Sequence, residues 1–130
     1  MKTFNFKLAV SFLAAFFCLL SFAGRAQISL PYTINNANNC TLVVEWKIYK
    51  QQGGCNTVCS SGSQTLVPFQ IITLPNMSCT SACKIEIRFD GSLGNPWLTC
   101  TGTLASQQVN TSCGQNLTQY VGSSSAYFVP

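Results

Sequence analysis

The chemistry open to this chain of 130 residues is limited by its side-chain types, because it contains eight cysteines and no histidine. Without histidine, neither a Ser-His-Asp nor a Cys-His nucleophile can be assembled from this chain, and the commonest general base and metal ligand are missing. Cys18 lies in an apolar N-terminal run. The other seven cysteines are spread over the rest of the chain: Cys40, Cys55, Cys59, Cys79, Cys83, Cys100 and Cys113.

The spacing of these cysteines favours disulfides over a metal site. Two pairs are each separated by three residues, and four such thiolates could bind zinc, but zinc ribbons and fingers normally use a two-residue gap in at least one arm. The Cys-x-x-Cys motif of a thiol oxidoreductase is also missing. We therefore expect no metal and no cofactor. The expected pairing closes two small loops and joins two strands: Cys55–Cys59, Cys79–Cys83, and a bridge between two of Cys40, Cys100 and Cys113.

An odd number of cysteines leaves one without a partner in the same chain. It could be a free thiol, a buried and inert side chain, or the link of a covalent dimer. The sequence leaves these three outcomes open.

Three carboxylates follow residue 26: Glu45, Glu86 and Asp90. Glu45 and Glu86 each fall on the polar face of an expected strand, so a glycosidase-like pair is one interpretation. The other is a set of cross-strand ion pairs with Arg88 and the neighbouring lysines, which contribute little when exposed. We favour the ion pairs and expect no enzymatic activity.

Aromatic side chains offer a candidate ligand site. Trp97, Tyr49 and Tyr120 could stack on a glycan or another small ligand. Alternatively, Trp97 closes one end of the core and the tyrosines cover its rim.

The elements that must position these groups are predicted to be strands. Residues 40–49 alternate with a period of two, which places Leu42, Val44, Trp46 and Ile48 on one side. Residues 84–89 alternate in the same way. These apolar faces have to be covered, so a second layer must pack on them.

Further strands are expected at 28–34, 64–74, 97–100, 118–121 and 126–129, where the second is bent at Pro68 or split in two. Pro31 cannot donate to a ladder, so the first is expected at a sheet edge. Residues 55–63 and 75–83 are expected to be loops, and 101–119 is polar and poorly patterned. The prediction is an all-β fold: a small antiparallel β-sandwich of six to seven short strands, stapled by disulfides, in one domain spanning 27–130.

Residues 1–26 are typical of a secretory signal peptide helix that is cleaved on export. Lys2 and Lys7 precede a charge-free apolar run at 8–23, and the small residues before Gln27 suit a signal peptidase. A cut after Ala23 and an uncleaved anchor are the alternatives, but the run is shorter than the roughly 20 residues of a spanning helix. We expect a secreted, periplasmic or envelope protein with no membrane span after cleavage.

After this cleavage four basic and three acidic side chains remain, which leaves a net charge of +1. Nucleic-acid binding requires clustered lysine and arginine, which the sequence does not contain, so no nucleic-acid partner is expected.

The region around residues 20–75 resembles small, uncharacterised, cysteine-rich secreted proteins of Bacteroidota-type bacteria. The shared features are Ala26-Gln27, a segment at 32–36, Asn39-Cys40-Thr41, a long strand, and a Cys-Asn-x-x-Cys loop followed by Ser-Gly-Ser. The resemblance implies export and a β fold but no activity. The expected function is that of an exported structural or interaction protein whose partner is a protein or glycan surface. A carbohydrate or small-ligand binding module, and a secreted inhibitor or toxin-like effector, are the alternatives.

Overall fold

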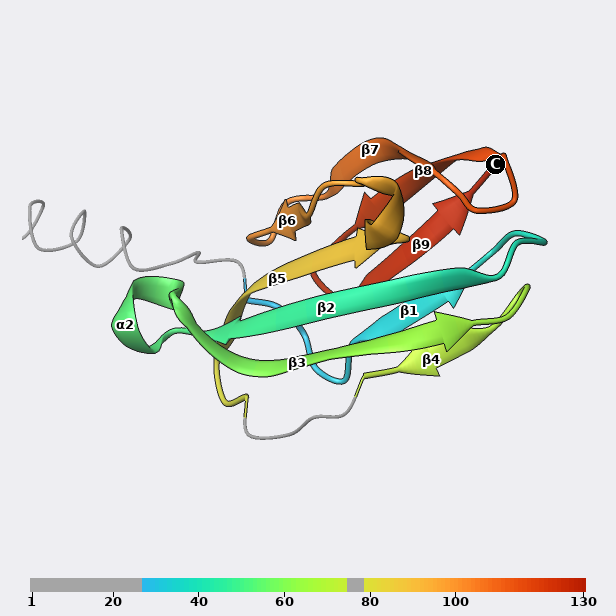
Figure 1. Cartoon of the computed structure of the whole chain (residues 1–130). Coiled ribbons are helices and arrows are strands. Elements are labelled where there is room, and N and C mark those ends of the chain that lie inside the picture. The colour runs from blue at the N-terminus through green and yellow to red at the C-terminus, as the bar shows by residue number, and fades with distance from the viewer. Residues whose placement is uncertain (1–26, 75–78) are drawn as a thin grey trace, which may run out of the picture.

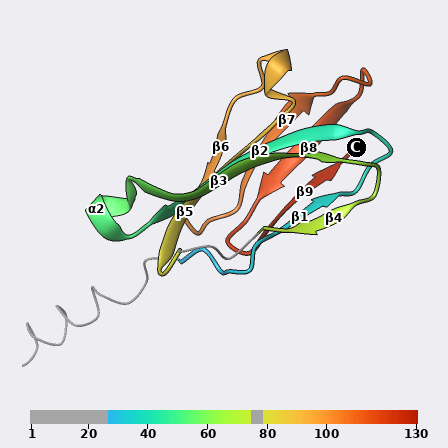
Figure 2. The same cartoon turned by 60° about the horizontal axis from the view of Figure 1, so that its bottom comes forward.

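Two β-sheets packed face to face make up the computed structural model, which describes residues 27–74 and 79–130 (Figure 1). The elements in chain order are β1 (Thr33–Asn36), β2 (Leu42–Lys50), the helical turn α2 (Gln52–Cys55), β3 (Thr57–Leu66), β4 (Ile71–Thr73), β5 (Ala82–Phe89), the 3-10 turn η1 (Gly91–Leu93), β6 (Leu98–Cys100), β7 (Ala105–Asn110), β8 (Asn116–Val121) and β9 (Ser125–Val129). One sheet has the strand order β3-β2-β5-β6 and the other β4-β1-β9-β8-β7 (Figure 2). The predicted all-β sandwich is confirmed.

The core lies between the sheets and is supplied by the strands whose alternation was predicted. Leu42, Val44 and Ile48 of β2 are fully buried, and Trp46 between them is 7% exposed. β5 contributes alternate residues in the same way, and the Phe89 ring packs on Phe128 of the opposite sheet. Burying one side chain of this size is worth roughly 1.5–3 kcal/mol, so these two strands account for much of the driving force.

Residues 27–74 and 79–130 form nine strands in place of the six to seven that were expected. β3 runs through 57–66, most of which was expected to be a loop, and pairs along the whole of β2. β7 lies in the polar stretch without pattern. The predicted 64–74 segment is split, as one alternative had it, into the end of β3 and the short β4.

The expectation that the first strand lies at a sheet edge was wrong. β1 begins two residues after Pro31 and lies between β4 and β9, so the proline falls outside the ladder and its missing N–H removes no hydrogen bond. β1 also runs parallel to β9, while the other strand pairs are antiparallel. The sandwich is therefore mixed rather than purely antiparallel.

Three turns meet at one end of the sandwich, on the right in Figure 1, and we call this the turn end. They are the β1–β2, β3–β4 and β7–β8 turns. The backbone N–H of Phe69 donates to the carbonyl of Asn38 at 3.1 Å, and Cys40 is bridged to Cys113. Segments about 70 residues apart are thus fastened together there.

Candidate functional site

The charged side chains of residues 27–130 all fall on β2, β5 or the residue that follows β5: Glu45, Lys47, Lys50, Lys84, Glu86, Arg88 and Asp90. Those that alternate with the buried residues form the outer surface of the four-stranded sheet, which we call the charged face. The five strands of the other sheet contain no charged residue. The molecule therefore presents two chemically different faces.

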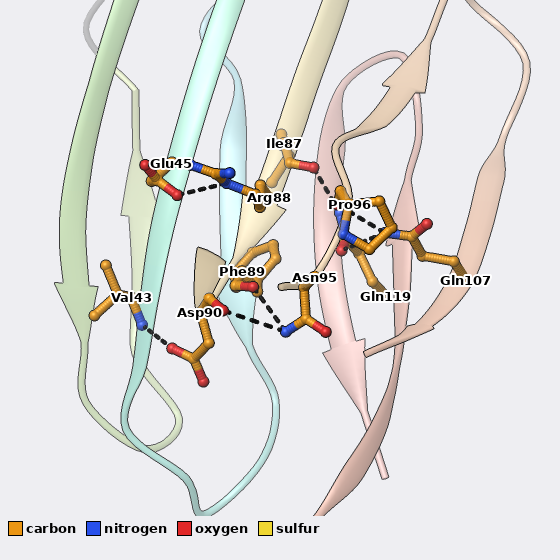
Figure 3. A network of polar contacts seen from close by, with 10 residues as sticks. All are labelled: Val43, Glu45, Ile87, Arg88, Phe89, Asp90, Asn95, Pro96, Gln107 and Gln119. Carbon is orange, nitrogen blue, oxygen red and sulfur yellow. Dashed lines mark hydrogen bonds and ion pairs between the residues drawn. The ribbon is translucent and has the colours of Figure 1, made fainter. Parts of the chain in front are cut away.

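Glu45 and Arg88 form the central ion pair of the charged face (Figure 3). Arg88 donates from Nε and Nη2 to the two carboxylate oxygens at 2.7 and 2.9 Å. These hydrogen bonds lower the pKa of the Glu45 carboxyl and raise that of Arg88. The pair lies directly over Gly91, because a Cβ there would come within 2.5 Å of atoms of both side chains. Glycine at this position leaves the space that the ion pair needs.

Glu86 is held by two neighbours on the same face. The Tyr49 hydroxyl donates to its Oε2 at 2.6 Å, and the Lys84 ammonium lies 3.2 Å from its Oε1. The hydrogen bond to the carboxylate raises the pKa of Tyr49 to about 12. Lys84 also lies over the Tyr49 ring, 3.7 Å from its centre. This half of the charged face is a compact cluster of three side chains that contact one another.

Trp97 packs on the charged face and does not close an end of the core. Its half-buried ring lies beneath two cations, with the Lys47 Nζ 4.4 Å and the Arg88 Cζ 4.7 Å from the ring centre. Cation–π contacts of this kind contribute about 0.5–1 kcal/mol at exposed sites. Because the ring already has these partners, it is a poor platform for a sugar.

The three predicted ligand-binding aromatics do not form one site. Trp97 and Tyr49 lie on the charged face, whereas Tyr120 of β8 lies on the outer surface of the five-stranded sheet. There its ring stacks on that of Tyr127 in β9, with centres 4.9 Å apart. Uncharged residues flank this pair on both neighbouring strands, with Ser106 of β7 opposite Tyr120 and Asn35 of β1 opposite Tyr127, and we call this surface the uncharged face.

The third carboxylate, Asp90, holds backbone groups in place of a substrate (Figure 3). It is 4% exposed and accepts hydrogen bonds from the N–H groups of Val43 at 2.8 Å and Ser112 at 3.3 Å. Beside it, the buried Asn95 amide donates to the carbonyls of Phe89 and Asn110. Two buried side chains thus fasten the end of β5 to the other sheet.

A buried glutamine adds a polar contact inside the sandwich. Gln119 of β8 is fully buried, and its amide donates to the carbonyl of Ile87 in β5 at 3.1 Å. Its own carbonyl accepts from Gln107, whose amide also donates to the carbonyl of Pro96 (Figure 3). These contacts tie the two sheets together and involve no reactive group.

The predicted small disulfide loops were wrong. Cys55 pairs with Cys83 and Cys59 with Cys79, so both bridges cross from the β3 side to the β5 side at the end of β2 that is opposite the turn end. The third bridge, Cys40–Cys113, follows the expectation that two of three cysteines join distant segments. With all four cysteines of the two pairs bridged, the zinc interpretation has no thiolates left, and the described residues contain no cluster suited to a metal.

Cys100 is the free cysteine among residues 27–74 and 79–130, and it is fully buried. Its thiol donates to the carbonyl of Thr103 at 3.1 Å, and its sulfur accepts from the N–H of Gly102 at 3.3 Å. Of the three open outcomes, the structure matches a buried thiol. A disulfide to a second chain through Cys100 would require β6 to open.

Sequence reasoning missed the most exposed aromatic side chain of the described residues. Phe69, in the β3–β4 turn, is 69% exposed and lies at φ +59°. It borders an open hollow of about 510 Å³ at the turn end. The signal was present in Pro68-Phe69, since a large aromatic after a proline in a turn lies at a position that usually holds glycine or asparagine.

The chain matches no protein-family model, and no curated protein or solved structure matches it. Within the described ranges, no helix is long and apolar enough to span a membrane.

Proposed function

We propose that the protein is an exported, non-enzymatic structural or interaction protein of the cell envelope or extracellular space. It acts by presenting the surface of a cross-linked β-sandwich. Three disulfides in a domain of about a hundred residues support an oxidising destination, since such bonds persist outside the reducing cytosol. The signal-like pattern of residues 1–26 and the resemblance to cysteine-rich secreted proteins support export in the same way.

The observation that carries the non-enzymatic part is the engagement of the carboxylates. A glycosidase acid must keep its proton near neutral pH, which requires a raised pKa, whereas Arg88 lowers the pKa of Glu45. Glu86 is occupied by Tyr49 and Lys84, and Asp90 by two backbone N–H groups. In a chain without histidine, these are the groups on which acid–base catalysis would depend.

The export proposal is tested by mass spectrometry of the protein recovered from the culture medium and the envelope fraction, with and without reduction. We expect a chain that begins at Gln27 with six oxidised cysteines. Recovery from the cytoplasm, with a mass that begins at Met1 and seven reduced thiols after residue 26, would contradict it.

The non-enzymatic proposal is tested with Glu45→Gln and Glu86→Gln against a panel of chromogenic glycosides. Wild type and both variants should show the same background rate, while both variants lose thermal stability. A turnover that the wild type shows and either variant abolishes would establish an enzyme.

A carbohydrate or small-ligand binding module is the second candidate, favoured by the stacked Tyr120–Tyr127 pair on a face without charge. Aromatic rings with surrounding hydroxyls and amides suit sugars, whose rings have apolar C–H faces. The inhibitor or effector alternative depended on two small disulfide loops, and the observed pairing replaces them.

A further inference from the structure

The hollow that Phe69 borders at the turn end has a lining that differs from both the charged face and the uncharged face. Its wall combines four amide side chains with three apolar ones: Asn38, Asn39, Gln115, Asn116, Ala37, Phe69 and Pro130. Asn39, Gln115 and Asn116 are exposed, and their side chains make no hydrogen bond to another residue of 27–74 or 79–130. Their donors and acceptors are therefore available to a ligand.

The conformation of Phe69 is not explained by stability. The N–H of Gln70 donates to the carbonyl of Val67, which defines a turn with Pro68 second and Phe69 third. A positive φ at the third position is the type II geometry, which favours glycine because a side chain there is strained. The Phe69 ring at this strained backbone position is mostly exposed to solvent. Strain retained at an exposed aromatic is typical of a functional position.

The turn that holds Phe69 is fastened to the β1–β2 turn. The N–H of Phe69 donates to the Asn38 carbonyl at 3.1 Å, and the fully buried Asn36 amide donates to the carbonyls of Val67 at 2.9 Å and Cys40 at 2.8 Å. Asn36 also accepts a hydrogen bond from Asn38. Two walls of the hollow are thus set by hydrogen bonds within the protein before any ligand arrives.

The third wall is held by a covalent bond. Gln115 and Asn116 come from the β7–β8 turn and the start of β8, and Cys113 in this turn is bridged to Cys40. The buried Thr111 hydroxyl donates to the Gln115 carbonyl at 2.7 Å and fixes the same turn. The hollow is therefore built from three distant segments in one rigid arrangement, which lowers the entropic cost of binding.

We propose that this hollow binds one residue of an uncharged saccharide, an inference that rests on the proposed role as an interaction protein. Amides both donate and accept, which suits neighbouring sugar hydroxyls, while Phe69 packs on the apolar C–H face of the sugar ring. No charged side chain borders the hollow. Asp90, which binds the Ser112 N–H in the β7–β8 turn, is buried and engaged with backbone groups. Neutral sugars are therefore preferred over acidic ones.

The test is a titration of the isotopically labelled mature protein with maltohexaose, cellohexaose, mannohexaose and chitohexaose, followed by nuclear magnetic resonance. At least one should shift the side-chain amide signals of Asn39, Gln115 and Asn116. Hexagalacturonate should bind at least tenfold more weakly. If none of the neutral oligosaccharides shifts these signals, or if the acidic one binds equally well, the inference is wrong. The export and oxidation results above would be unaffected by that failure.

Phe69→Gly separates a ligand role from a structural one. Removing the strained side chain should leave the melting temperature unchanged or raised, while the affinity for the bound oligosaccharide falls at least tenfold. Leu104→Ala, which removes a side chain that is 61% exposed and lies outside the hollow, should leave the affinity unchanged. Binding that survives Phe69→Gly but disappears in Tyr120→Ala would assign the ligand to the uncharged face instead. A hydrophobic peptide that occupies the hollow more tightly than every sugar would also overturn the proposal.

Discussion

The surroundings of individual side chains in this protein change their reactivity or their ionisation. Cys100 is enclosed by β6 and its following turn, and Tyr49 is bound to a carboxylate on the surface. Burial keeps reagents away from the Cys100 thiol, and the charged neighbour of Tyr49 raises the pKa of its hydroxyl. Each can be tested by one substitution.

The mature protein should contain one reactive thiol, and only after unfolding. Native protein should not react with a water-soluble disulfide reagent, because the Cys100 sulfur is fully buried. In concentrated guanidinium one thiol per chain should titrate, and Cys100→Ala should titrate none. Rapid labelling of native protein, or a dimer on non-reducing gels that Cys100→Ala removes, would contradict the buried position.

The Tyr49–Glu86 hydrogen bond should make stability fall in alkali. The pKa of Tyr49 is raised from 10.0 to about 12 in the folded state, so its contribution is complete below pH 10 and is lost as the pH rises through 12. Tyr49→Phe should melt roughly 2–5 °C lower at pH 7 and show a shallower decline between these pH values.

Glu86→Gln is the matched control for this prediction, since it removes the charge and keeps the shape. Glu86→Gln leaves a neutral acceptor for the Tyr49 hydroxyl and removes the charge that pairs with Lys84. The double variant should be more stable than the sum of the two single losses predicts, because both changes weaken the same hydrogen bond. Thermal melts from pH 7 to pH 12 measure both effects. Additive losses would show that the two side chains act independently.

At the scale of elements, the central strands could be predicted from the sequence and their partners could not. β2 and β5 alternate between core and surface, so a period of two marks them. β3 carries serines and a glycine and is mostly exposed, so its pattern resembles a loop. It is a strand because β2 offers it a complete ladder of backbone partners. β7 was missed for the same reason.

The disulfide pairing failed because of this missed strand. An extended segment advances about 3.3 Å per residue, so cysteines four apart along it lie roughly 13 Å from each other. A disulfide needs Cα atoms within about 7 Å. Cys59 lies inside β3, and its Cα is 5.4 Å from that of Cys79. Cys55 lies at the end of α2, before the strand begins, and its Cα is 6.0 Å from that of Cys83. Of the candidate ligand site, the residue types were predictable, but their division between two faces required knowledge of which strands pair.

Gly62 of β3 should prove essential to the β2–β3 pair. It lies opposite Trp46, and a Cβ at this position would come within 2.4 Å of the indole ring, which is buried in the core. Gly62→Ala should destabilise the protein by about 1–3 kcal/mol. Ser61→Ala, on the exposed neighbour, should stay within about 0.5 kcal/mol. Guanidinium unfolding midpoints measure both, and equal midpoints would contradict the contact.

At the scale of the whole molecule, the charged, the uncharged and the amide-rich surfaces lie on different sheets and ends of the sandwich. One face carries charge balanced by internal pairs, the other carries none, and the turn end holds an aromatic and amide hollow. Two disulfides secure the end around α2 and one secures the turn end. Covalent cross-links thus hold both ends of the sandwich.

The parallel pairing of β1 with β9 determines how the domain bears a mechanical load. Because the two strands run in the same direction, residue 27 and Pro130 lie toward opposite ends. A pull on both would slide one strand along the other and load all their hydrogen bonds at once, instead of opening them one by one. The Cys40–Cys113 bridge would then confine the extension to the segments outside it. Force spectroscopy should record one high-force event with a short gain in length, and a much longer gain after reduction.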